Sequence, residues 1–363
     1  MGVCDFCDAS GQFFLHTLKP PPSLLTIILD TNPHAWALLA PTLPLSAAIA
    51  NLLVFINAHL AFNNSNKVAV IASHTQRADF LYPIPSQDDS LQANGSAHNG
   101  AQNDRDGDAK MVDSDEGSGT ATGDDANHYR PFRHIQTTLL SAISKLYKTT
   151  SPESLTPTTS IAGALTLALT YINKQSIALS TTTSSKTNAD TLIAPADPNL
   201  IQSATLNPRI LILSVSGDLA HQYIPIMNTI FACKFIYPLK ILPLTRNYLL
   251  DADSTIPSGQ RLTIPIDICK IAGDSVFLQQ ASDATHGTYI ALTHPRGLLQ
   301  YLMLGFLPDQ SNRKYLVPPT AVGVDFRAAC FCHRKVVDVG FVCSICLSSK
   351  SGLSTGLCWN VRG

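Results

Sequence analysis

The sequence predicts an α/β fold built around a mainly parallel sheet. Two observations support this fold class. Short runs of branched apolar residues alternate along the chain with longer segments whose apolar residues recur at helical spacing. Strands that are apolar at almost every position are typical of parallel sheets, because helices cover both of their faces. Apolar residues make up 45% of the 363 residues, which is enough to bury one large domain or two ordinary ones.

The expected elements follow in order along the chain. Residues 24–30 and 67–73 read as buried strands, and residues 45–62 between them carry apolar side chains at helical spacing. The other expected strands are a short edge strand at 80–82 and buried strands at 209–215, 264–271 and 287–292. The other expected helices are 135–147, 161–172, 219–231, 276–285 and 295–306, the last with a proline in its first turn.

Three segments interrupt this pattern. Residues 86–127 hold eight acidic residues between Asp104 and Asp125, so we expect a disordered acidic loop there. A polar loop is expected at about 175–207 and an atypical insertion at about 234–259. The predicted organisation is therefore an N-terminal tail (1–23), an α/β domain (24–317) and a small C-terminal module (318–363).

Charge and composition argue against several classes of protein. The 25 Lys and Arg residues nearly balance the 26 Asp and Glu residues, whereas phosphate binding normally requires a basic surplus. We therefore expect direct contact with nucleic acid to be weak or absent. No run reaches the roughly eighteen apolar residues of a membrane helix, so no membrane association is expected. The N-terminus lacks the basic region of a secretory signal, and the odd number of cysteines, nine, favours a reducing compartment.

The C-terminal module carries a candidate zinc site. Its predicted ligands are two close cysteine pairs: Cys330 with Cys332, and Cys343 with Cys346. Two thiolate pairs separated by a hairpin-sized spacer suit a tetrahedral Cys₄ site, which stabilises a fold and leaves no open position for catalysis. Because the first pair has only one intervening residue, His333 and Cys358 are alternative ligands. The competing interpretation is four buried structural thiols.

A carboxylate follows the first predicted strand. Asp30 is followed by Thr-Asn-Pro-His, and ligands of open α/β sheets bind beyond the carboxyl ends of the strands. A metal-ion-dependent adhesion site has the pattern D-x-S-x-S, but Asn32 and His34 occupy the two serine positions, and His is a poor ligand for Mg²⁺. The residues that could complete such a site are Thr158, Thr159, Ser160 and Asp218. We expect this degenerate loop to form an N-cap and turn without binding metal.

No catalytic motif accompanies these sites. The sequence lacks a G-x-S-x-G motif, a P-loop and a G-x-G-x-x-G motif, and its histidines are scattered. Cys233 and Cys269 lie in apolar surroundings and are expected in the core. The sequence therefore predicts no enzyme.

Several stretches of the chain resemble the family of 34-kDa von Willebrand factor A (vWA) subunits of the general transcription factor TFIIH. They are ILDTNP at 28–33, MNTIFA at 227–232, FLQQA at 277–281, LQYL at 299–302, FLPDQ at 306–310, VDFRAACFCHR at 324–334 and GFVCSICL at 340–347. The stretch at 324–334 is the most specific, because it joins the end of the domain to the first cysteine pair. Residues 234–259 and 348–363 depart from the family pattern. We interpret them as lineage-specific segments or as errors in the gene sequence.

The resemblance implies a vWA-type, doubly wound, mainly parallel sheet flanked by helices, followed by the Cys₄ zinc module. It implies a non-enzymatic structural subunit of the nuclear TFIIH core, acting in RNA polymerase II transcription initiation and nucleotide excision repair. The implied partners are the TFIIH subunit with its own vWA domain and a RING-like zinc domain, and the other core subunits. The implied cofactor is structural zinc. A metal-ion-dependent vWA ligand-binding protein is the alternative.

Overall fold

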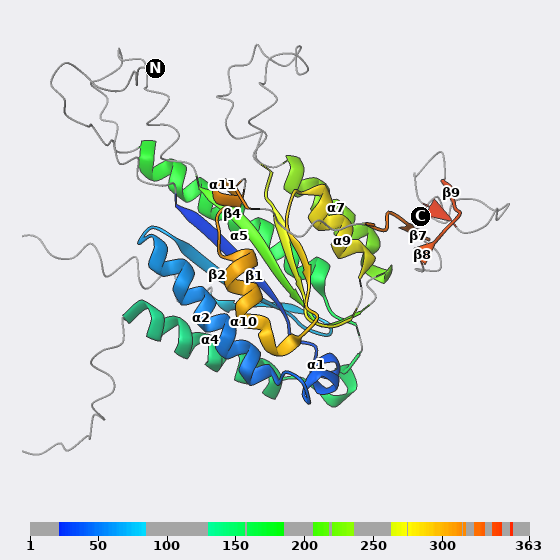
Figure 1. The fold of residues 1–363 in the computed structure, drawn as a ribbon, viewed down its shortest axis with the longest axis horizontal. Helices are drawn as coiled ribbons and strands as arrows, with labels where there is room; N and C mark the ends of the chain where they lie inside the picture. Colours follow the sequence, from blue (N-terminus) through cyan, green and yellow to red (C-terminus); the bar gives the residue numbers. More distant parts are fainter. Residues whose placement is uncertain are drawn as a thin grey trace, which may run out of the picture.

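The structure is a computed structural model of the chain. It describes residues 22–84, 130–156, 158–184, 206–217, 220–235, 263–273, 275–313, 315–316, 323–330, 336–342 and 349–350. The described residues form a six-stranded sheet with helices on both faces, and two small ladders near the C-terminus (Figure 1). The predicted α/β class with a mainly parallel sheet is confirmed.

The six-stranded sheet has the order β3-β2-β1-β4-β5-β6. All neighbouring strands are parallel except β3, which pairs antiparallel with β2 at one edge, as expected for the short edge strand. The central position of β1 brings its last residue between the ends of β2 and β4. The strands are β1 (Ser23–Asp30), β2 (Lys67–Ser73), β3 (Ala78–Tyr82), β4 (Asn207–Ser214), β5 (Ile266–Lys270) and β6 (Tyr289–Ala291).

Helices enclose the sheet in two layers. One hydrophobic cluster packs α1, α2, α4, α10 and η4 against one face, and a second cluster packs α5, α7 and α9 against the other. The helices of the first layer are α1 (Pro33–Leu39), α2 (Leu45–Phe62), α4 (Arg130–Lys148) and α10 (Leu298–Tyr301), which η4 (Leu302–Phe306) continues. The helices of the second layer are α5 (Ile161–Ser184), α7 (Tyr223–Phe235) and α9 (Val276–Ala284).

The central strand explains why the sequence shows a continuous apolar run. All eight residues of β1 are buried. Leu25 and Ile27 belong to the cluster on one face, whereas Leu24 and Ile28 belong to the cluster on the other. Successive side chains of a strand point to opposite faces, so a strand covered on both sides needs apolar residues at nearly every position.

Helix α5 is longer than the sequence predicted. It continues to Ser184, so the first part of the polar loop expected at 175–207 is helical. Two tertiary contacts support the extension: Leu179 packs against the second hydrophobic cluster, and Lys67 Nζ donates to Gln175 Oε1 at 2.8 Å. Polar composition hid these contacts, because helical stability in proteins comes largely from packing rather than from propensity.

Helix α2 is long and apolar enough to cross a membrane by length and composition, alone among the described residues. This corrects the expectation that no segment reaches that length. Leu52, Phe55 and Ile56 of this helix are fully buried against the sheet. A core helix passes the same test, so the finding is weak evidence for a membrane span.

Candidate functional site

The carboxylate of Asp30 lies at the carboxyl edge of the sheet, where the parallel strands end. Its Oδ1 accepts a hydrogen bond from the backbone N–H of Asn32 at 3.1 Å. Its Oδ2 accepts from the N–H groups of Val215 at 3.2 Å and Ser216 at 2.7 Å, in the loop after β4. Both oxygens therefore accept hydrogen bonds from the backbone, and the carboxylate links the ends of β1 and β4.

Burial dominates the electrostatics of Asp30. The side chain has no exposed surface, and this desolvation raises the pKa of the carboxyl group above its ordinary value of 3.8. The hydrogen bonds from Ser216, Asn32 and Val215 act in the opposite direction, because they stabilise the ionised form. The hydrogen-bond donors therefore offset only part of the cost of burying this carboxylate.

Asn32 is the N-cap of α1, a helix that was not predicted, and it lies in the loop where an N-cap was expected. Its Oδ1 accepts from the backbone N–H of His34 at 3.0 Å. Its Nδ2 donates to the carbonyl oxygens of Thr156 and Thr158 at 3.2 and 3.3 Å. Asn32 is fully buried by these contacts, whereas His34 is exposed on the first turn of the helix.

A hydroxyl network surrounds Asp30 at the ends of β1 and β2. Thr159 Oγ1 donates to the carbonyl of Ser73 at 2.9 Å and lies 2.7 Å from Ser73 Oγ. Tyr147 donates to the carbonyl of Thr31 at 3.0 Å, and His74 Nδ1 lies 3.0 Å from the same oxygen. Burial lowers the pKa of His74. These groups bind one another at the edge of the sheet.

The described groups that could ligate Mg²⁺ at this edge already accept hydrogen bonds from the backbone. Magnesium requires oxygen ligands directed at one point, but both Asp30 oxygens accept N–H groups and Asn32 Oδ1 is the helix cap. Asp218, another residue of the predicted loop set, lies outside the described residues. In the described part of the chain, no group of three or more His, Cys, Asp or Glu side chains could hold a metal ion.

The predicted zinc ligands lie mostly outside the described residues. Of the six candidates, the structure describes Cys330, which is buried. The others are Cys332, His333, Cys343, Cys346 and Cys358. The buried Cys233 and Cys269 lie in the core, as expected, and burial raises the pKa of Cys233 to about 12.

Two small ladders bracket the two cysteine pairs. Strand β7 (Ala328–Ala329) pairs antiparallel with β8 (Val336–Val337), and β9 (Phe341–Val342) pairs antiparallel with β10 (Ser349–Lys350). The first cysteine pair therefore belongs to the connection between β7 and β8, and the second to the connection between β9 and β10. Because β10 also lies against β7, the two connections belong to one small module.

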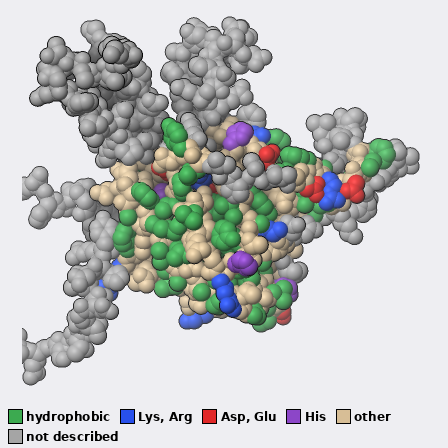
Figure 2. All heavy atoms as spheres, viewed as in Figure 1, with side chains coloured by type: hydrophobic (Ala, Val, Ile, Leu, Met, Phe, Trp, Pro, Cys, Tyr) green, Lys and Arg blue, Asp and Glu red, His purple; other side chains and the backbone are tan. Residues whose placement is uncertain are grey.

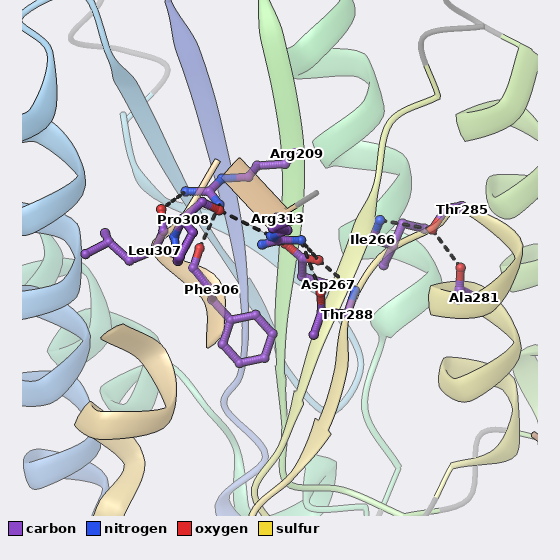
Figure 3. A network of polar contacts seen from close by, with 10 residues as sticks. All are labelled: Arg209, Ile266, Asp267, Ala281, Thr285, Thr288, Phe306, Leu307, Pro308 and Arg313. Carbon is purple, nitrogen blue, oxygen red and sulfur yellow. Dashed lines mark hydrogen bonds and ion pairs between the residues drawn. The ribbon is translucent and has the colours of Figure 1, made fainter. Parts of the chain in front are cut away.

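A second polar network, which the sequence analysis missed, lies near the amino ends of β4 and β5 (Figure 3). Asp267 is fully buried and forms a two-point ion pair with Arg313, with N–O distances of 2.6 and 2.7 Å. Arg209 is also buried and donates to the carbonyls of Phe306 at 2.6 Å and Pro308 at 3.2 Å. The sequence feature that could have revealed this network is the presence of a charged residue within each of two mainly apolar strands, Arg209 in β4 and Asp267 in β5. The network therefore attaches the chain that follows η4, including Arg313, to the amino ends of these strands.

Comparisons with known proteins agree over nearly the whole chain. Residues 22–253 and 245–359 match the family described as transcription factor Tfb4. The chain is 38% identical to the general transcription and DNA repair factor IIH subunit tfb4 of Schizosaccharomyces pombe, over 90% of this chain and 84% of that protein. It is 34% identical to the corresponding TFB4 subunit of Saccharomyces cerevisiae, over 92% of this chain and 83% of that protein.

A solved structure supports the same relationship. The crystal structure of the TFIIH p34 N-terminal domain matches with a TM-score of 0.53 and 41% identity, covering 79% of this chain and 98% of that one. The two spans that match the family overlap at 245–253, inside the atypical segment. The second span runs to 359, so it includes most of the C-terminal segment that we expected to depart from the family.

Proposed function

The chain belongs to the Tfb4 family of transcription and DNA repair factor IIH subunits, and from this premise we propose that it is a non-enzymatic structural subunit of the TFIIH core. In this role it acts in the nucleus, in RNA polymerase II transcription initiation and in nucleotide excision repair. Its proposed partner is the TFIIH subunit that carries a second vWA domain and a RING-like zinc domain, together with the other core subunits.

The observation that carries the scaffold proposal is that both carboxylate oxygens of Asp30 accept backbone hydrogen bonds. In a vWA-type ligand receptor, a metal at the carboxyl edge of the sheet would bind the ligand. Here three backbone N–H groups occupy the Asp30 oxygens, and Asn32 caps a helix. This favours binding through side-chain surfaces over binding through a metal.

An apolar face on α2 and η4 supports partner binding. Phe62 of α2 is 72% exposed, Leu304 of η4 is 77% exposed, and Val54 of α2 is 48% exposed. The two elements are in contact, and α2 contains no Lys, Arg, Asp or Glu. Figure 2 shows hydrophobic side chains gathered over the face on which α2 and α10 lie. Exposed apolar clusters of this kind mark protein interfaces, so we propose this face for the RING-bearing subunit.

We propose that structural zinc holds the C-terminal module together. The ligands would be Cys330, Cys332, Cys343 and Cys346, with His333 and Cys358 as alternatives. The two ladders support this assignment, because each brackets one cysteine pair and β10 lies against β7. A four-thiolate shell would stabilise strands of only two residues each, which bury too little apolar surface to fold alone.

Co-purification with the RING-bearing subunit tests the proposed function. We expect a stoichiometric complex that survives chelation of Mg²⁺ and contains about one zinc ion in this chain. Leu304→Asp should weaken the complex, whereas Ile177→Asp, at an exposed apolar residue of α5 on the opposite layer, should not. A complex that dissolves on removal of Mg²⁺ and reforms on its addition would contradict the scaffold proposal. Equal binding by both variants would place the interface elsewhere.

A further inference from the structure

Gln280 of α9 binds the segment that leads into the C-terminal module. The side chain is buried, with 7% of its surface exposed. Its Nε2 donates to the backbone carbonyls of Asp325 at 2.7 Å and Arg327 at 3.1 Å. Both hydrogens of the amide group are therefore donated to two carbonyls of one segment, immediately before β7.

Further contacts hold the same segment. Arg327 binds the side chain of Asp325 through its Nε and Nη2 at 2.8 and 2.6 Å, and it reaches Asp338, beyond β8, at 2.7 Å. Ala329 of β7 is buried and belongs to the hydrophobic cluster that contains Phe277 of α9. Because the exposed ion pairs of Arg327 contribute little, the buried amide and Ala329 provide the main attachment.

From this geometry we infer that Gln280 seats the C-terminal module on α9, so that the module has a fixed orientation on the α/β domain. Cys330 comes three residues after Arg327, at most about 11 Å along the chain, and is itself buried. We call the two hydrogen bonds from Gln280 to the carbonyls of Asp325 and Arg327 the clamp. The clamp therefore also positions the first cysteine of the proposed zinc site, and it slows loss of the metal. This last step rests on the proposed zinc site, whereas the seating of the module does not.

The neighbouring glutamine provides a matched control. Gln279 and Gln280 are adjacent on α9, but successive residues of a helix point about 100° apart. Gln279 is more exposed than Gln280. The same substitution at the two positions therefore has the same effect on helix propensity and differs in its effect on the clamp.

The experiment compares Gln280→Glu and Gln280→Leu with Gln279→Glu and Gln279→Leu in the full chain. Glutamate keeps the size of the side chain but places an acceptor against two carbonyl oxygens, and leucine leaves both carbonyls without a donor. We expect hydrogen exchange across residues 323–330 to become roughly tenfold faster in both Gln280 variants. Zinc release to a colorimetric chelator should accelerate by a similar factor. The Gln279 variants should behave as the unmodified chain does.

The outcomes separate the clamp from the zinc proposal. Unchanged exchange across 323–330 in both Gln280 variants, with the α/β domain folded by circular dichroism, would overturn the clamp. Faster exchange in a chain that holds no zinc would support the clamp while contradicting the zinc assignment. Faster exchange with unchanged zinc release would overturn the link between the clamp and the metal.

Discussion

At the scale of single residues, the carboxyl edge of the sheet is held by polar groups that bind the backbone. Asp30 accepts three N–H groups, Asn32 caps α1, and Trp36 Nε1 donates to the carbonyl of Asp30 at 2.7 Å. A buried donor that loses its acceptor costs free energy, because water cannot replace the lost partner. The residues of this edge therefore matter for stability of the fold, and this dependence is measurable.

Replacement of Asp30 by alanine should lower the free energy of unfolding by about 2–4 kcal/mol, because three buried N–H groups lose their acceptor. Relief of the carboxylate's desolvation offsets part of the loss. Urea unfolding measures the change. His34→Ala, at an exposed position on the first turn of α1, should change the free energy of unfolding little. A rise in the melting temperature of the unmodified chain on addition of Mg²⁺, absent in Asp30→Ala, would instead indicate a metal at Asp30.

The buried histidine at the end of α2 predicts a pH dependence. Burial lowers the pKa of His59 to about 4, assisted by the positive charge of Arg209, whose Nη2 lies 3.5 Å from His59 Nδ1. In the unfolded chain, His59 has its ordinary pKa of 6.5, so it binds a proton more readily than in the folded chain. The stability that comes from neutral His59 is therefore present above pH 6.5 and is lost as the pH falls toward 4. A shift of this size corresponds to about 3 kcal/mol. Unfolding of His59→Gln should therefore be less pH-dependent than that of the unmodified chain between pH 6.5 and 4.

The comparison of the unmodified chain with His59→Gln separates the contribution of His59 to the pH dependence of stability from that of the other titrating groups. Asp30 has the opposite sign, because its raised pKa favours the folded state at low pH. Its contribution is common to both proteins and cancels in the difference. Parallel pH profiles for the unmodified chain and His59→Gln would contradict the prediction.

At the scale of elements, the sequence predicts what depends on local pattern. The strands were placed correctly because both faces of β1, β2 and β4 are covered, which requires continuous apolar runs. An N-cap in the loop after Asp30 was expected, but the helix α1 that Asn32 caps was not predicted. The extent of α5 was missed, because Leu179 and Gln175 are held by distant elements.

The polar networks could not be predicted for the same reason. Asp30 meets its donors at Val215 and Ser216, and Arg209 meets its acceptors near Phe306, far along the chain in both cases. A single sequence gives the residue types but not these pairings. The register of the parallel strands brings them together.

The Asp267–Arg313 pair should behave as a buried anchor of α11 (Gln310–Arg313). Arg313→Met should cost about 3 kcal/mol of unfolding free energy, because it leaves the fully buried carboxylate of Asp267 without its cation. Addition of Asp267→Asn to Arg313→Met should recover part of this loss, since no buried charge then remains. Arg296→Met, at an exposed arginine, serves as the control for urea unfolding. Equal, additive losses from the two changes would show that the two residues do not interact.

At the scale of the whole molecule, the chain combines two kinds of stability. The α/β domain has a hydrophobic cluster on each face of its sheet, whereas the C-terminal strands are two residues long. The domain can therefore fold by burial of apolar surface, whereas we expect the module to depend on the proposed zinc. Figure 1 shows β7, β8 and β9 on the side of the molecule where α7 and α9 lie, so the two parts meet at that layer.

Removal of zinc should therefore affect the two parts unequally. We expect Cys343→Ser, or a strong chelator, to abolish zinc binding and to accelerate hydrogen exchange across residues 336–342. The melting temperature of the α/β domain should fall by no more than about 4 °C, as expected when a domain of this size loses about 1 kcal/mol at one contact surface. Cys233→Ser serves as the control, because it changes a core thiol and should retain zinc while lowering stability. Collapse of the α/β domain together with the metal would show that the two parts fold as one unit, and zinc retained in Cys343→Ser would shift the ligand set toward His333 or Cys358.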